Sequence, residues 1–134
     1  MDERDVAAIP LFAGLSRDDR RVVAQYADEV DVPAGTKLAQ EGRFAYEFFA
    51  IKDGTAEVTK EGQRIADLGP GDFFGEIGLL SEERRVASVT ATSPMSLVVL
   101  TGAQLRAIES RMASVGQRIR EAMSQRLEAD RARG

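Results

Sequence analysis

The sequence predicts a mainly β protein, a β-roll of the jelly-roll or double-stranded β-helix kind with helices before and after it. Short apolar segments separated by glycine-containing turns occupy the middle of the chain, from about residue 30 to residue 100. Apolar residues at helical spacing precede this region and return after it. The 134 residues are enough for one hydrophobic core, so residues 1–134 are expected to form a single domain.

Residues 6–28 are expected to form N-terminal helices. Apolar residues recur at helical spacing up to Tyr26, but Pro10 and Gly14 interrupt them, which predicts two short helices rather than one. Ser16 is the expected N-cap of the second helix, because its hydroxyl can accept a free amide of the first turn.

Residues 30–100 are expected to form the β-roll. Five turns divide this region: Pro33-Ala34-Gly35, Glu41-Gly42, Asp53-Gly54, Glu61-Gly62 and Gly69-Pro70-Gly71. Asp-Gly is a strong signal for a tight hairpin. Residues 49–51 and 56–58, on either side of Asp53-Gly54, are therefore expected to pair as neighbouring strands.

Residues 101–130 are expected to form C-terminal helices. Their apolar residues fall along one helical stripe, made of Leu105, Ile108, Met112, Val115, Ile119 and Ala122 or Met123. Gly116 lowers helix stability by about 1 kcal/mol relative to alanine, so it is the expected place for a bend or a break.

The composition excludes several kinds of chemistry. The chain contains no cysteine and no histidine. Disulfides, cysteine-held iron–sulfur clusters, ordinary zinc sites and histidine-dependent nucleophiles are therefore absent. We expect no enzymatic activity and no resident cofactor or metal.

Charge and hydropathy bear on partners and location. Residues 1–100 carry 11 basic and 18 acidic side chains, whereas residues 101–134 carry 7 basic and 4 acidic ones. The acidic body disfavours direct nucleic-acid binding. The polar N-terminus and the absence of an apolar run of roughly 18–20 residues predict a cytoplasmic chain that does not insert into a membrane.

Residues 69–89 fit neither a plain strand nor a plain helix. They contain Phe74-Gly75-Glu76-Ile77-Gly78-Leu79-Leu80, followed ten residues after Gly75 by Arg85 and then by Val86-Ala87-Ser88-Val89. This segment resembles the phosphate-binding cassette of the cyclic-nucleotide-binding family, and the resemblance extends over roughly residues 6–120. It implies a regulatory domain that binds a cyclic nucleotide through Phe74, Gly75, Glu76, Ile77, Gly78, Leu79, Arg85, Val86 and Ala87.

The residue types suit this ligand. A glycine-rich turn leading into a short helix directs backbone N–H groups toward one point, where the oxygens of a cyclic phosphate can bind. Gly75 and Gly78 allow close approach of the backbone, and Arg85 offers a planar fork of donors. Glu76 is expected to accept a hydrogen bond from the free ribose 2′-hydroxyl.

Simpler interpretations exist for each charged residue taken alone. Glu76 also suits the first turn of a short helix, where the helix dipole favours a carboxylate. Arg85 also suits a surface ion pair with Glu82 or Glu83, the role expected of Arg84. The joint occurrence of these residues at the family's spacing favours the binding site.

Two departures from the family pattern bear on the ligand. Val86 stands where relatives that favour cyclic GMP tend to have threonine, so cyclic AMP is the expected ligand and cyclic GMP the alternative. The acidic residue that often holds the cassette arginine has only Glu47 as its nearest counterpart, about one position displaced.

The resemblance also implies that the C-terminal helix closes over the base and changes position when the ligand binds. Ile119, Met123, Arg118 or Arg120 could cover the base, although core packing or a dimer contact is the more common role of such residues. The output would then pass to a protein partner or a second copy. The alternative is a ligand-free interaction module that dimerises through its C-terminal helix.

Overall fold

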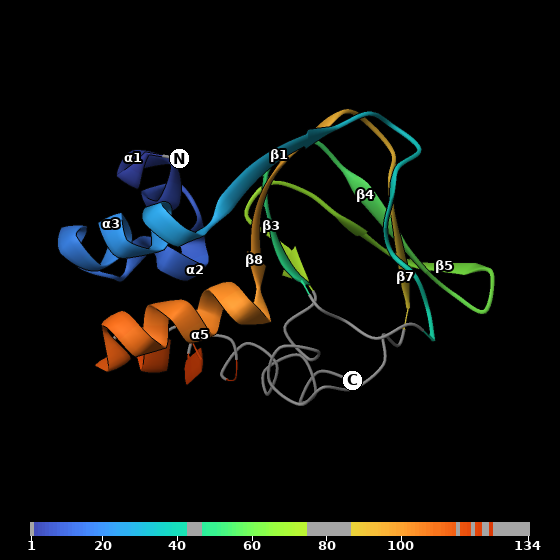
Figure 1. Cartoon of the computed structure of the whole chain (residues 1–134). Coiled ribbons are helices and arrows are strands. Elements are labelled where there is room, and N and C mark those ends of the chain that lie inside the picture. The colour runs from blue at the N-terminus through green and yellow to red at the C-terminus, as the bar shows by residue number, and fades with distance from the viewer. Residues whose placement is uncertain are drawn as a thin grey trace.

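The computed structural model describes residues 2–42, 47–74, 87–114, 116–118, 120, 121 and 124. The helices are α1 (Glu3–Ala7), α2 (Pro10–Ala13), α3 (Arg17–Tyr26) and α5 (Gly102–Arg111). The strands are β1 (Asp28–Val32), β2 (Lys37–Ala39), β3 (Glu47–Asp53), β4 (Ala56–Lys60), β5 (Gln63–Leu68), β6 (Phe73–Phe74), β7 (Ser88–Ala91) and β8 (Met95–Thr101). The helices gather at one end of the strands (Figure 1), as the predicted β-roll with flanking helices requires.

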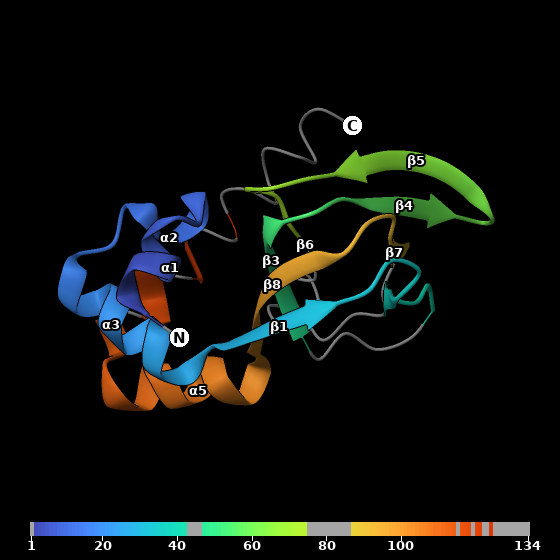
Figure 2. The same ribbon diagram turned by 90° about the horizontal axis from the view of Figure 1, so that it is seen from above.

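The strands form two four-stranded antiparallel sheets. Their orders are β1-β8-β3-β6 and β2-β7-β4-β5. Each of the first four strands lies in a different sheet from the one before it, so the chain crosses repeatedly between the two walls of a roll. Figure 2 shows β1, β3 and β8 running from the helical end into this roll.

The predicted hairpin at Asp53-Gly54 is wrong. β3 pairs with β6 and β8, whereas β4 pairs with β5 and β7, so the two strands on either side of this turn belong to different sheets. Gly54 does adopt the positive φ of 92° that such a turn needs. The turn carries the chain around a corner of the roll.

The corner is fixed by a second corner beside it, between β7 and β8. The Thr55 N–H donates to Ser93 Oγ at 2.9 Å, and the Thr92 N–H donates to the Thr55 carbonyl at 2.9 Å. A side chain at Gly54 would place its Cβ 2.4 Å from the Pro94 carbonyl oxygen. Bonds to the neighbouring corner therefore replace the strand pairing that the Asp-Gly signal predicts.

The hairpin of this region is formed by β4 and β5. Glu61 and Gly62 connect them with φ of 53° and 79°, the two positive values of a type I′ turn. The other predicted turns also have a glycine with positive φ, at Gly35, Gly42 and Gly71. The turns were thus predicted correctly, whereas the strand partners were not.

The N-terminal segment contains three helices rather than two. The additional helix is α1, which a capping box at its start stabilises. In it, Asp2 accepts the Arg4 N–H at 2.9 Å and its own N–H donates to Asp5 at 3.3 Å. The predicted cap of α3 is confirmed, because the Asp19 N–H donates to Ser16 Oγ at 3.1 Å.

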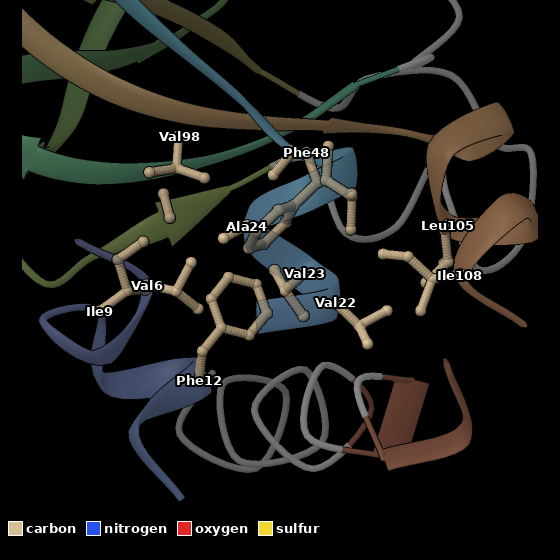
Figure 3. Close-up of a cluster of buried hydrophobic side chains, with 13 residues drawn as sticks. Val6, Ile9, Phe12, Val22, Val23, Ala24, Phe48, Val98, Leu105 and Ile108 are labelled. Carbon is tan, nitrogen blue, oxygen red and sulfur yellow. The ribbon is translucent and has the colours of Figure 1, made fainter. Parts of the chain in front are cut away.

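Two clusters of buried side chains form the core. One joins the helices to the outside of the first sheet and includes Phe12, Phe48, Val98, Leu105 and Ile108. Figure 3 shows these side chains converging from α2, β3, β8 and α5. The other fills the space between the sheets and includes Phe49, Ile51, Val89, Leu97 and Val99.

The break in the C-terminal helical region lies earlier than predicted, and the described residues after it (113, 114, 116–118, 120, 121 and 124) are helical again. α5 ends at Arg111, and Met112 has φ of −144° and ψ of 88°, outside the helical region. The break thus lies four residues before Gly116. At Gly116, an added Cβ would lie 2.1 Å from Glu109 Cγ and 3.1 Å from Glu109 Cα, so the chain after α5 packs closely against that helix.

No helix within the described ranges is long and apolar enough to cross a membrane.

Candidate ligand-binding site

The structure describes two of the nine predicted ligand-binding residues, Phe74 and Ala87. Gly75, Glu76, Ile77, Gly78, Leu79, Arg85 and Val86 lie outside the described residues. The strands on either side of residues 75–86, β6 before them and β7 after them, are described.

The entry to this segment is β6, whose two phenylalanines face different cores. The Phe73 ring lies 5.4 Å from the Phe48 ring, centroid to centroid, on the side of the helices. The Phe74 ring stacks on Phe49 at 4.9 Å, with 20° between the planes, on the side of the roll interior. Alternation along the strand places successive side chains on opposite faces, so β6 is anchored from both sides.

The exit is β7, which lies between β2 and β4 in the second sheet. Ala87, just before this strand, is half-buried, and Val89 and Ala91 are buried in the roll interior. β6 is an edge strand of the first sheet. The two ends of residues 75–86 are therefore held on opposite walls of one roll.

The interior between these walls is apolar. Five of its side chains are only partly buried, although they pack against the core: Val32, Leu38, Val58, Leu68 and Phe74. Such side chains provide a surface on which a flat apolar ring can rest.

A hydrogen bond that the sequence analysis missed holds the exit strand. The Glu41 N–H donates to Ser88 Oγ at 3.0 Å, and Glu41 Oε2 accepts the Glu61 N–H at 3.3 Å. The sequence offered one signal, a hydroxyl residue directly after Arg85-Val86-Ala87. Its partner, 47 positions away, follows only from the pairing of β2 with β7.

The candidate base-covering arginines have other partners in this structure. Arg118 pairs with Asp19 of α3, and Arg120 pairs with Glu109 of α5. These contacts hold both guanidinium groups against helices. The other two candidates, Ile119 and Met123, lie outside the described residues.

Glu47, the nearest counterpart of the acidic residue that holds the cassette arginine, begins β3 and is exposed. Its Cα partner across the ladder is Thr101. Arg85 lies outside the described residues, so its contact with Glu47 stays a prediction.

A partly exposed charge network lies between the roll and the first helix. Lys52 Nζ lies 2.6 Å from Glu29 Oε1 and 3.3 Å from Asp5 Oδ1. The hydrogen bond to Glu29 is the main cause that raises the pKa of Lys52, and the bond to Asp5 adds to it, against the effect of burial. This network joins α1, β1 and β3.

Within the described ranges, no group of three metal-binding side chains comes together.

The comparisons with known proteins agree with this architecture. The model of the cyclic nucleotide-binding domain family matches residues 29–111. A Rhodopseudomonas palustris protein named as a potassium channel is 35% identical over 120 residues, covering 87% of this chain and 29% of its own length. The chain spans less than a third of the length of the curated relatives it matches.

Two solved structures are similar over most of the chain. A cyclic nucleotide-binding domain from Methylobacillus flagellatus superposes with a TM-score of 0.83 at 27% identity, covering 97% of this chain and 75% of that one. The regulatory domain of Toxoplasma gondii PKA, crystallised with cAMP, has a TM-score of 0.68 at 31% identity, covering 79% of this chain and 42% of that one. The chain therefore belongs to the cyclic nucleotide-binding domain family.

Proposed function

We propose that this chain is a regulatory domain that binds cyclic AMP between the two sheets of its roll and catalyses no reaction. One observation carries the proposal: β6 and β7 hold the two ends of residues 75–86 on opposite walls of an apolar roll. The family match covers both strands, and the T. gondii relative was crystallised with cAMP.

Residues 75–86 are proposed to hold the phosphate and the ribose. The N–H groups around Gly75 and Gly78 would donate to the phosphate oxygens, and the Arg85 guanidinium would donate to them in a bidentate manner. Glu76 would accept from the ribose 2′-hydroxyl. Phe74, Ile77, Leu79, Val86 and Ala87 would complete the walls of the site.

The purine is proposed to rest on the partly buried apolar residues of the roll interior. Burial of a flat ring there releases water from apolar surface on both partners. Val86 offers no hydroxyl to the amino group of guanine, so we propose cyclic AMP as the ligand in preference to cyclic GMP.

Ligand binding is proposed to shift the position of the segment after α5. In this structure the ion pairs of Arg118 and Arg120 hold that segment against α3 and α5. A ligand bound about 100-fold more tightly by a second arrangement would shift the equilibrium by roughly 2.7 kcal/mol. The signal would pass to a protein partner or to another part of a longer chain.

Titration calorimetry of the purified chain with cyclic AMP, cyclic GMP and 5′-AMP tests this function. We expect cyclic AMP to bind more tightly than cyclic GMP, because a hydroxyl partner for guanine is lacking. The open phosphate of 5′-AMP carries an additional charge and another shape, so we expect it to bind least tightly. Equal affinity for all three nucleotides, or no binding of any, would contradict the proposal.

A further inference from the structure

We propose that Ser88, through its hydrogen bond with the Glu41 backbone, is a positioning residue for the phosphate-binding arginine. The inference rests on the proposed function and adds to it a residue outside the predicted ligand contacts. Ser88 touches no ligand in this proposal. Its side chain determines where the strand that follows Arg85 begins.

The hydroxyl of Ser88 extends a ladder that the backbone does not continue. The pairing of β2 with β7 ends at Ala39 and Val89, after a register shift. Beyond that point, the Glu41 N–H donates to Ser88 Oγ at 3.0 Å. On its other side, Ser88 lies opposite Thr59 of β4. The first residue of β7 is thus held from both neighbouring strands, on one side by its side chain.

The contact continues to the tip of the β4–β5 hairpin. Glu41 Oε2 accepts the N–H of Glu61 at 3.3 Å. Glu61 is the non-glycine residue with a φ of 53° in the turn of that hairpin. Glu41, which follows β2, therefore contacts both the β4–β5 turn and β7. Ser88 is the residue of β7 that makes this contact.

Chain connectivity places this anchor close to Arg85. Only two residues separate Ser88 from Arg85 in the sequence, and the three peptide units between them span at most about 11 Å. Arg85 can donate to a phosphate in two directions only if its backbone is held in a narrow range of positions. If β7 began one or two residues later, the backbone of Arg85 would occupy a wider range of positions.

The experiment measures the affinity for cyclic AMP by titration calorimetry in matched variants. Ser88→Ala is expected to weaken binding about fivefold, the equivalent of one ordinary hydrogen bond. Ser88→Thr keeps the hydroxyl and is expected to stay within about twofold of wild type. Ser93→Ala is the control, because it removes a hydroxyl that accepts the Thr55 N–H at 2.9 Å at a corner of the roll. It is expected to leave affinity unchanged.

A double-mutant cycle separates positioning from a general loss of structure. If Ser88 acts through Arg85, Ser88→Ala has no further effect on affinity in an Arg85→Ala background. Should Ser88→Ala fail to fold, Ser88→Val replaces it, since valine favours strands and lacks only the hydroxyl of threonine. Comparison with Ser88→Thr then isolates that one group.

The outcomes are distinguishable. Equal affinities of Ser88→Ala and Ser93→Ala, or an undiminished effect in the Arg85→Ala background, would overturn the positioning role while the proposed function stands. A wild-type chain that binds no cyclic nucleotide would overturn both.

Discussion

The guanidinium of Arg118 bonds to the carboxylate of Asp19, 99 positions earlier in the chain. The Asp19 side chain is only 9% exposed, whereas that of Arg118 is 46% exposed. A carboxylate this buried is costly without a charged or hydrogen-bonding partner. The pair therefore fastens the segment after α5 to the first turn of α3.

Removing Arg118 should weaken the fold measurably. Arg118→Ala is expected to lower the free energy of unfolding by about 1–2 kcal/mol, because it leaves a buried carboxylate without this partner, an effect moderated by the exposure of the arginine. Urea unfolding measures it. Arg21→Ala is the control, since its pair with Asp18 is mostly exposed and is expected to contribute less than about 0.5 kcal/mol. Equal losses in both variants would contradict a special role for the Asp19 pair.

Replacing Gly54, at the corner between β3 and β4, is expected to cause a larger loss of stability. Gly54→Ala is expected to cost about 2–5 kcal/mol, because it combines a positive φ with a Cβ that meets backbone atoms. Gly14→Ala is the matched control: its φ is −79°, and nothing lies within 4 Å of the added Cβ. That variant is expected to be neutral or to stabilise the chain by up to about 1 kcal/mol. Thermal or urea unfolding of both proteins distinguishes a fixed corner from a tolerant loop.

The free energy of unfolding is expected to fall at alkaline pH because of Lys52. Its pKa is raised above the ordinary value of 10.5, first by the bond to Glu29. Folding therefore favours the protonated lysine. This contribution is complete below pH 10.5 and is lost as the pH rises through the raised pKa.

The comparison with Lys52→Met isolates this contribution from other groups that titrate at high pH. The difference in the free energy of unfolding between wild type and Lys52→Met is expected to be about 1 kcal/mol at neutral pH. It should shrink once the pH exceeds 10.5. A difference that stays constant through this range would show that the lysine charge contributes nothing.

Local signals in the sequence predicted local features. The glycine turns and the Ser16 cap are confirmed because each depends on residues close together in the chain. The β3–β4 pairing failed for the opposite reason. Asp53-Gly54 has the turn geometry of a hairpin, but bonds to Thr92 and Ser93, nearly 40 positions away, carry the strands into different sheets.

The end of α5 shows the same limit. Gly116 was expected to break the helix because glycine has low helix propensity, yet the break lies at Met112. Gly116 is needed instead where the returning chain approaches Glu109, and such a contact depends on tertiary packing.

The motif in residues 74–89 identified the family correctly, because it is a joint pattern of residues and spacing rather than one propensity. The roles of its individual residues stay predictions.

We propose that Arg85 holds the phosphate of a cyclic nucleotide. Calorimetric titration of cyclic AMP into wild type, Arg85→Ala and Arg84→Ala tests this role. We expect Arg85→Ala to weaken binding by at least about 2 kcal/mol, roughly 30-fold, because it removes a charge-assisted contact. The neighbouring Arg84→Ala should bind like wild type. Unchanged affinity in Arg85→Ala, or an equal loss in both variants, would show that Arg85 does not hold the phosphate.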